Sequence, residues 1–241
     1  MDHVLESSSK KVRTLERSLL PLFATIALSG CLVVSSPGAS AEREDLRMLP
    51  KPRYESDVSV EQALRSRRSI RSFEPDPLTL AEVSQLLWAA QGVTGYRFRT
   101  APSAGALYPL EVRLVVGNVD GLPAGVYRYV SHEHALVKVL EGDVRDELAT
   151  AAVWQEWAGK GSIVLVFSAV YERTTKKYGD RGIRYAHIEV GHAAQNVYLQ
   201  AETLGLGTVM VGAFMDSTVK QLLQMSDEEQ PLAILPVGRP R

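Results

Sequence analysis

The feature of this sequence that most restricts its fold is a continuous apolar run, SIVLVFSAV, at residues 162–170. A run of this length without charged residues predicts a β-strand that is covered on both faces of its sheet. The rest of the chain must therefore supply helices to pack on that sheet. Its composition, 45% hydrophobic and 23% charged over 241 residues, is typical of a globular protein and not of a disordered one.

Helical and strand patterns occur in mixed order along the chain. Capping-box sequences at residues 59–62 and 79–82 predict two helices, the second over residues 80–91, and alternating apolar residues predict a strand at 110–118. The remaining predicted elements are a hairpin over 125–142, helices over 144–158, 183–204 and 217–225, and strands over 162–170, 208–214 and 231–238. Without strict strand–helix–strand alternation, this order predicts an α+β fold with a central mixed or antiparallel sheet flanked by helices.

The first forty-one residues differ from the rest of the chain. Lysines and arginines between positions 10 and 17 precede an apolar run at 19–34, which ends before Ala39-Ser40-Ala41, as in a secretory signal. Leu28–Cys31 resembles a bacterial lipobox, so simple export, a lipoprotein anchored at Cys31 and an uncleaved anchor are alternatives. We therefore expect an exported protein, periplasmic or attached to the cell envelope. Residues 1–41 are then the export signal, 42–58 a linker and 59–241 the folded domain.

A cluster of arginines and serines, RSRRSIRSF, occupies residues 65–73 of a chain whose formal net charge is only −1. The near balance of charge makes a nucleic-acid-binding surface improbable, so the cluster needs a local explanation. Guanidinium groups and serine hydroxyls suit the oxygens of a phosphate, and Arg239 would place another guanidinium at the end of the last strand. The alternative is a solvated basic helix end.

Other catalytic patterns are weak. His187, Glu189 and His192 follow the spacing H-x-E-x-x-H, which differs from the zinc motif H-E-x-x-H, so we predict no metal site. No G-x-S-x-G motif is present, which leaves an α/β-hydrolase serine without support. Gly205-Leu206-Gly207 follows a predicted helix and is interpreted as its stop and turn.

Four segments in order resemble the nitroreductase superfamily of FMN enzymes, and within it the SagB/ThcOx-type dehydrogenases. They are RRSIRSF (67–73), PSAGALYPLEV (102–112), the stretch 177–214 that begins KYGDRGIRYAHIEVGHAAQN, and PVGR (236–239). Together they span nearly all of residues 59–240. The resemblance implies an FMN-dependent oxidoreductase of nitroreductase-like fold, a homodimer with its flavin sites at the subunit interface.

The resemblance also implies roles for particular residues. The arginine motif and Arg239 would hold the FMN phosphate, the segment at 102–105 would contact the flavin, and backbone N–H groups of the 211–212 pair would lie near flavin N5. Lys177 and Tyr178 match a Lys-Tyr pair associated with catalysis in azoline oxidases. The implied cofactor-binding residues are Arg67, Arg68, Ser69, Arg71, Pro102, Ser103, Ala104, Gly105, Val211, Gly212 and Arg239.

Three functional hypotheses follow, the first two from the resemblance and the third from the lipobox-like Leu28–Cys31 and the lack of an obvious single catalytic group. The first is hydride transfer through flavin N5, with dehydrogenation of an azoline or another small-molecule or peptide substrate. The second is reduction of nitro or quinone compounds with NAD(P)H as electron donor. The third is a non-catalytic flavin-binding protein of the envelope, attached to the membrane through its N-terminal segment.

Overall fold

Strand β5 (Ile163–Val170) runs through the middle of the sheet and is buried along its whole length. The computed structural model describes residues 46–153 and 155–241. Residues 163, 165 and 167 of β5 belong to one hydrophobic cluster, and residues 164 and 166 belong to a second cluster on the opposite face. The prediction of a strand covered on both faces is therefore confirmed.

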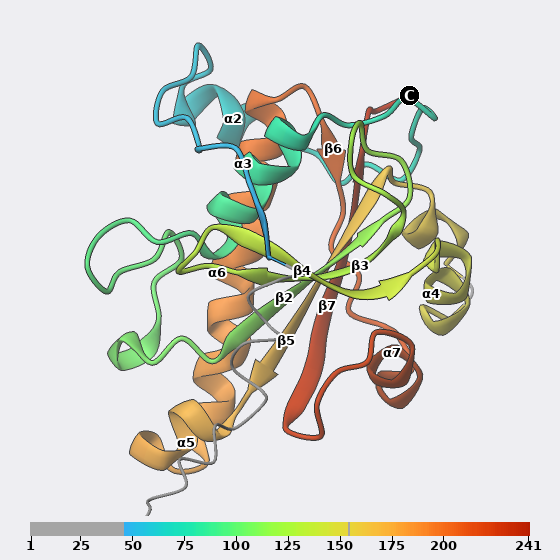
Figure 1. Cartoon of the computed structure of the whole chain (residues 1–241). Coiled ribbons are helices and arrows are strands. Elements are labelled where there is room, and N and C mark those ends of the chain that lie inside the picture. Colours follow the sequence, from blue (N-terminus) through green and yellow to red (C-terminus); the bar gives the residue numbers. More distant parts are fainter. Residues whose placement is uncertain (1–45, 154) are drawn as a thin grey trace, which may run out of the picture. The chain divides into compact units, whose positions relative to one another are not determined.

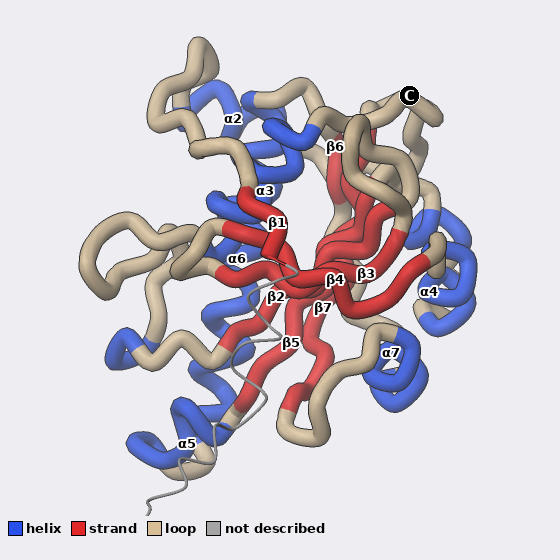
Figure 2. Tube along the Cα trace, viewed as in Figure 1, coloured by secondary structure: helices blue, strands red, loops and turns tan. Residues whose placement is uncertain are grey.

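The described residues form a seven-stranded sheet in the order β1-β4-β3-β2-β5-β7-β6, and all neighbouring strands pair in antiparallel fashion. Figure 2 shows this sheet in red among the helices. The other strands are β1 (Leu46–Met48), β2 (Leu110–Val116), β3 (Gly125–Val130), β4 (Ala135–Glu141), β6 (Gly207–Thr208) and β7 (Glu229–Gly238). The hairpin predicted over residues 125–142 corresponds to β3 and β4.

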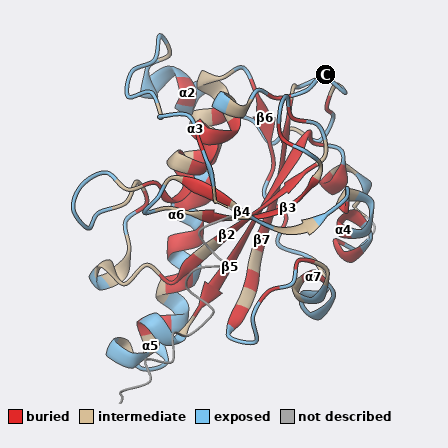
Figure 3. Cartoon of the chain, in the orientation of Figure 1, coloured by how far each residue is buried: buried red, intermediate tan, exposed pale blue. Residues whose placement is uncertain are grey.

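Helices cover both faces of the sheet. On one face, α3 (Leu80–Gln91) and α6 (Arg181–Thr203) contribute Leu86 and Val190 to the larger cluster. On the other, α4 (Arg145–Ala151) and α7 (Asp216–Leu222) contribute Leu148 and Val219. Figure 1 shows these helices around the sheet, and Figure 3 shows that the buried residues concentrate in the sheet and on the helix faces turned towards it. The predicted α+β fold, with an antiparallel sheet flanked by helices, is confirmed.

Two shorter helices frame the candidate site. Helix α2 (Val60–Ser66) begins at a capping box on Ser59 and packs against α6. Helix α5 (Glu172–Tyr178) directly precedes α6 and packs against its first turns. Both capping boxes that the sequence predicts, at Ser59 and Thr79, are formed.

Three segments differ from the sequence prediction. Residues 46–50, predicted as part of a linker, pack on the domain instead, because β1 pairs with β4 and Leu49 is buried. The helix predicted over 144–158 ends at Ala151 and is followed by a 3-10 turn at Glu156–Gly159. The strand predicted over 208–214 is only two residues long, and it is followed by a single bridge between Val211 and Ile234.

The export signal predicted over residues 1–41 lies outside the described residues. Within residues 46–153 and 155–241, no helix has the combination of length and apolar character that a membrane span requires.

Candidate functional site

The arginine cluster, which we define as Arg67, Arg68, Ser69 and Arg71, follows α2 directly. Backbone pairing fixes its path, because Ser69 forms a parallel bridge with Thr208 of β6 and the N–H of Ile70 donates to the Thr208 carbonyl at 2.9 Å. Further along, Phe73 forms a bridge with Pro240 near the C-terminus. The structure thus brings the cluster next to β6 and the end of β7, as the predicted phosphate site requires.

Two guanidinium groups of the cluster lie over aromatic rings. The Arg67 guanidinium is 5.3 Å from the centroid of the Tyr198 ring, and that of Arg71 is 5.2 Å from the Trp157 ring. Cation–π contacts of this kind hold a guanidinium in place and leave its N–H groups available to an anion. Tyr198 also lies 3.3 Å from the Ser69 hydroxyl, oxygen to oxygen, and accepts a hydrogen bond from the Met210 N–H at 2.8 Å.

The other two predicted phosphate ligands are already engaged. Arg68 Nη1 donates to the carbonyl oxygens of Arg65, Ser66 and Arg67 and so closes the C-terminal end of α2. Arg239 forms a two-point ion pair with Glu82, with N–O distances of 2.8 and 3.1 Å. Burial alone would raise the pKa of Glu82, but hydrogen bonds from Thr79 and Arg239 hold it below its ordinary value.

The fit of a phosphate to this cluster rests on Arg67, Ser69 and Arg71. Arg67 is half-buried and Arg71 exposed, and among the described residues neither forms an ion pair with a carboxylate. Two uncompensated guanidinium groups beside a hydroxyl form the donor set that a phosphate monoester needs. The residues present therefore fit the phosphate end of FMN, with Arg68 and Arg239 as supporting groups.

A second group of predicted residues lies at a loop, which we call the PSAG loop (Pro102–Gly105). Gly105 has a φ of +63°, and a Cβ atom placed on it would be only 2.6 Å from Tyr178 Oη and 3.0 Å from Lys177 Nζ. Both side chains of the predicted catalytic pair therefore face this loop from α5. The Lys177 ammonium also lies 5.2 Å from the centroid of the Tyr178 ring.

Helix α6 contacts both groups of residues, but from different sides. His192 Nδ1 lies 3.3 Å from the Pro102 carbonyl oxygen of the PSAG loop, whereas Tyr198 contacts the arginine cluster. Six residues separate these two positions, which corresponds to about 9 Å along the helix axis and roughly 240° around it. The structure thus does not gather all predicted cofactor ligands of one chain into a single site.

The Val211–Gly212 pair lies near the arginine cluster. Of its two backbone N–H groups, both predicted to lie near flavin N5, one already donates a hydrogen bond within the sheet. The Val211 N–H donates to the Ile234 carbonyl at 2.8 Å, because this residue pairs with β7. Gly212 is exposed at the next position and is the residue of the pair that can offer its N–H to a ligand. A Cβ atom on Gly212 would meet nothing within 4 Å.

Sequence reasoning did not identify four residues that the structure places at these two groups: Tyr198, Trp157, Arg99 and Glu189. Tyr198 and Ser69 are 129 positions apart, so no local pattern connects them. In the sequence Glu189 belongs only to a weak metal-site pattern, and in the described parts of the chain no group of His, Cys, Asp or Glu side chains is placed to hold a metal ion. It lies instead in the wall of a pocket of about 250 Å³ lined by Pro102, Ser103, Ala104, Tyr185, Ile188, Glu189 and His192.

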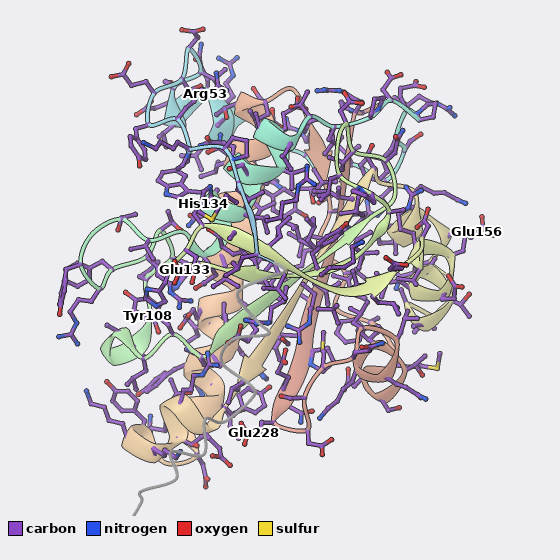
Figure 4. All side chains as sticks on the ribbon, in the orientation of Figure 1. Arg53, Tyr108, Glu133, His134, Glu156 and Glu228 are labelled. Atoms are coloured by element: carbon purple, nitrogen blue, oxygen red, sulfur yellow. The ribbon has the colours of Figure 1, made fainter. Side chains whose placement is uncertain are left out.

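A larger pocket, of about 510 Å³, lies between residues 53–60 and helices α2, α3 and α6. Arg53, labelled in Figure 4, stands at its N-terminal side. Its lining contains none of the predicted site residues. We therefore assign the candidate site to the two smaller regions, where the chemically suitable side chains meet.

Comparisons with known proteins identify the family of this chain. The model of the nitroreductase family matches residues 64–239. The protein MJ1384 of Methanocaldococcus jannaschii is 51% identical over 184 residues, which cover 76% of this chain and 92% of that protein. The Microcin B17-processing protein McbC of Escherichia coli is 28% identical over 206 residues, which cover 80% of this chain and 76% of McbC.

A solved structure extends the likeness to three dimensions. The E. coli microcin synthetase McbBCD complex with truncated pro-MccB17 bound contains a chain that superposes with a TM-score of 0.65 at 27% identity. The match covers 87% of this chain and 84% of that one. The chain therefore belongs to the nitroreductase family, whose members are oxidoreductases.

Proposed function

We propose that this protein is an FMN-dependent dehydrogenase that oxidises an azoline-type ring in a peptide or small molecule. The observation that carries the proposal is the position of Lys177 and Tyr178, whose side-chain tips face Gly105 of the PSAG loop. The similarity to McbC supports a peptide substrate, because McbC is named for microcin processing and the related complex holds a truncated pro-microcin.

The chain's own residues would hold the cofactor from two sides. Arg67 and Arg71 provide guanidinium donors for the phosphate, and Ser69 adds a hydroxyl. Gly212 and the PSAG loop allow the close backbone approach that a flat ring system needs. When bound, FMN supplies the two-electron acceptor that takes a hydride from the substrate.

Oxidation of an azoline to an azole removes one hydride and one proton from adjacent ring atoms. A protein group must accept the proton, and at the PSAG loop Tyr178 Oη and Lys177 Nζ are the side-chain atoms that a Cβ placed on Gly105 would approach most closely. A positioned acid–base group of this kind typically contributes a factor of about 10²–10⁴ to the rate. We propose that Tyr178 or Lys177 accepts this proton.

We also propose that the active form is a homodimer. The PSAG loop and the arginine cluster lie on different sides of α6 within one chain, so a second copy can present its PSAG loop to the arginine cluster of the first. In a two-fold dimer this arrangement would create two equivalent sites.

The FMN site is tested with the double variant Arg67→Ala/Arg71→Ala. A hydrogen bond to a charged group contributes about 1.5–3 kcal/mol, so loss of both guanidinium groups should weaken FMN binding by at least about a hundredfold. Titration of the apoprotein with FMN, followed by flavin fluorescence, measures the change. The double variant Arg53→Ala/Arg65→Ala removes the same charge from exposed positions and should bind FMN as the parent does. Equal affinity of the two double variants would refute the assigned phosphate site.

A second candidate function is reduction of nitro or quinone compounds by NAD(P)H, which the 51% identity to MJ1384 favours because that protein is named as a nitroreductase. Stopped-flow reduction of the bound flavin under anaerobic conditions separates the two functions. The dehydrogenase should be reduced rapidly by an azoline-containing peptide and slowly by NADPH. The opposite order would assign the protein to the reductases.

A further inference from the structure

The PSAG loop continues into a strained segment. Three of four consecutive residues have positive φ angles, +63° at Gly105, +53° at Ala106 and +48° at Tyr108. Outside glycine this conformation is uncommon and costs about 1–3 kcal/mol per residue. Strain of this size persists only where neighbouring groups hold the backbone in place, so the contacts around the loop decide its conformation.

Tyr108 is the residue through which the loop is fastened, and Figure 4 shows where it lies. Its N–H donates to Ser103 Oγ at 2.9 Å, and its hydroxyl accepts from the Arg99 N–H at 3.2 Å. The Arg99 guanidinium lies 4.7 Å from the centroid of the Tyr108 ring, and Arg173 Nη1 donates to the Tyr108 carbonyl at 3.2 Å. Ser103 and Arg99 therefore determine how firmly the strained segment is held.

Glu189 of α6 faces the same two residues from the interior. It is only 1% exposed, and neither carboxylate oxygen has a hydrogen-bond partner among the described residues. Gln91 Nε2 and Arg99 Nε are buried nearby and also have no hydrogen-bond partner among the described residues. Burial raises the pKa of Glu189 to about 7, although Ser103, Arg99 and Gln91 oppose the increase. These three approach the carboxyl without reaching ordinary hydrogen-bond geometry.

The uncharged acid suits this environment better than the carboxylate. A protonated carboxyl can donate to Ser103 Oγ, which accepts from the Tyr108 N–H and has a second lone pair free. Its other oxygen can accept from Gln91 Nε2 or Arg99 Nε. An ionised carboxylate would add a buried charge that Arg99 offsets only in part, and the loop could relieve the remaining cost by opening to water.

We propose that Glu189 is a positioning residue of the candidate site: its uncharged carboxyl holds the PSAG loop and Tyr108 in the closed conformation, and its ionisation releases them. The proposal deepens the proposed function, on which it rests only in treating this loop as part of the flavin site.

The direction of the pH effect follows from linkage. Glu189 has a pKa of about 7 beneath the closed loop, against an ordinary value of 4.5 when exposed. Between these values the closed form holds a proton that the open form lacks, so closure weakens as the pH rises and levels off above about 7. For one such group, the closing equilibrium should fall about thirtyfold between pH 5.5 and pH 8.

Other charged groups surround Glu189 and must be controlled. Arg99 faces it from the preceding loop, and beyond Arg99 lies the ion pair of Arg173 with Glu111, with an N–O distance of 2.6 Å. His192 lines the same pocket from α6. Because the His192 imidazole is another ionisable group in this pocket, a His192→Gln variant is the matched control.

The test is amide hydrogen exchange of the FMN-free protein at pH 5.5 and pH 8, with each rate divided by its intrinsic value. In the parent and in His192→Gln, protection of residues 103–108 should fall about thirtyfold over this range, while β5 stays protected. In Glu189→Gln, whose amide resembles the uncharged acid, protection should be high and independent of pH. An undiminished fall in Glu189→Gln would overturn the proposal.

Infrared spectroscopy of the parent protein provides a second measurement, which does not depend on folding of the variant. A protonated-carboxyl band should persist to about pH 7 and be absent from a folded Glu189→Gln sample. Absence of such a band above pH 6 would also overturn the proposal.

FMN titration of the same samples separates the role of Glu189 from the proposed function. A loop that responds to pH in a protein that binds no FMN refutes the proposed function alone. FMN binding without the pH response refutes the role of Glu189 alone.

Discussion

At the scale of single residues, the sheet interior contains a buried ion pair whose partners are 116 positions apart in the sequence. Arg113 of β2 donates to Glu229 Oε1 at 2.8 Å, and the other oxygen of Glu229 accepts from the Ser168 hydroxyl at 2.7 Å. Arg113 and Glu229 are only 3% and 5% exposed. The carboxylate therefore compensates a guanidinium that no water can reach freely.

Glu229→Ala should lower the free energy of unfolding by about 3–5 kcal/mol, because it leaves Arg113 charged and buried without a partner. Chemical denaturation followed by circular dichroism measures the change. The exposed neighbour Glu228, labelled in Figure 4, provides the control, and Glu228→Ala should change stability little. Similar losses in the two variants would show that the pair does not have this role.

The same ion pair also affects the stability of the folded protein at acidic pH. Burial alone would raise the pKa of Glu229, but Arg113 and Ser168 lower it below its ordinary value. A group with a lowered folded pKa stabilises the protein above its unfolded pKa, and that stability is lost as the pH falls through the folded value. Glu229 and Glu189 therefore act in opposite directions, and over different pH ranges.

At the scale of elements, the start of α3 links the fold to the candidate site. Thr79 Oγ1 accepts from the Glu82 N–H at 3.2 Å, and Glu82 Oε2 accepts from the Thr79 N–H at 2.8 Å. The same Glu82 carboxylate pairs with Arg239 after β7. The capping box thus orients the carboxylate that holds a predicted phosphate ligand.

Thr79→Ala should cost about 1 kcal/mol of stability, since the first turn of α3 loses its N-cap acceptor. Thr79→Ser keeps the hydroxyl and should retain most of that stability. Thermal unfolding of the three proteins under identical conditions measures the difference. If the serine variant is destabilised as much as the alanine variant, the hydroxyl is not the stabilising group.

At the scale of the whole molecule, the two groups of site residues predict a particular behaviour of mixed dimers. Arg67→Ala/Arg71→Ala removes one group, and Gly105→Leu should displace the other because its side chain would meet Tyr178 and Lys177. Each variant alone should bind little FMN. If the sites form between subunits, a mixed dimer has one site with both groups intact.

Unfolding and refolding the two variants together in equal amounts should yield mixed dimers as half of all dimers, each with one of its two sites intact. Flavin binding should then recover to about a quarter of the parent stoichiometry, measured by FMN absorbance after gel filtration. A mixture that binds no more FMN than the separate variants would place the complete site within one chain.

The element order and the α+β class could be predicted from the sequence, because capping boxes, period-two strands and the apolar run at 162–170 are local signals. The arginines and serines concentrated at residues 65–73 made that segment a phosphate candidate, and the resemblance to the nitroreductase superfamily singled out Arg67, Ser69 and Arg71 within it. The short length of β6 and the early end of α4 were not predicted, because pairing with β7 and packing on the sheet decide such boundaries.

Which side chains from distant parts of the sequence contact one another could not be predicted in this way and is seen in the folded structure. The Arg67 guanidinium lies over the Tyr198 ring, Arg239 forms an ion pair with Glu82, and Glu189 lies beneath the PSAG loop. The Val211 N–H donates to the Ile234 carbonyl of β7. Each of these outcomes depends on burial, or on a contact between residues far apart along the chain. The physical reason is that a residue's type fixes which groups it can donate or accept, whereas the fold fixes which partner reaches it and how much water remains.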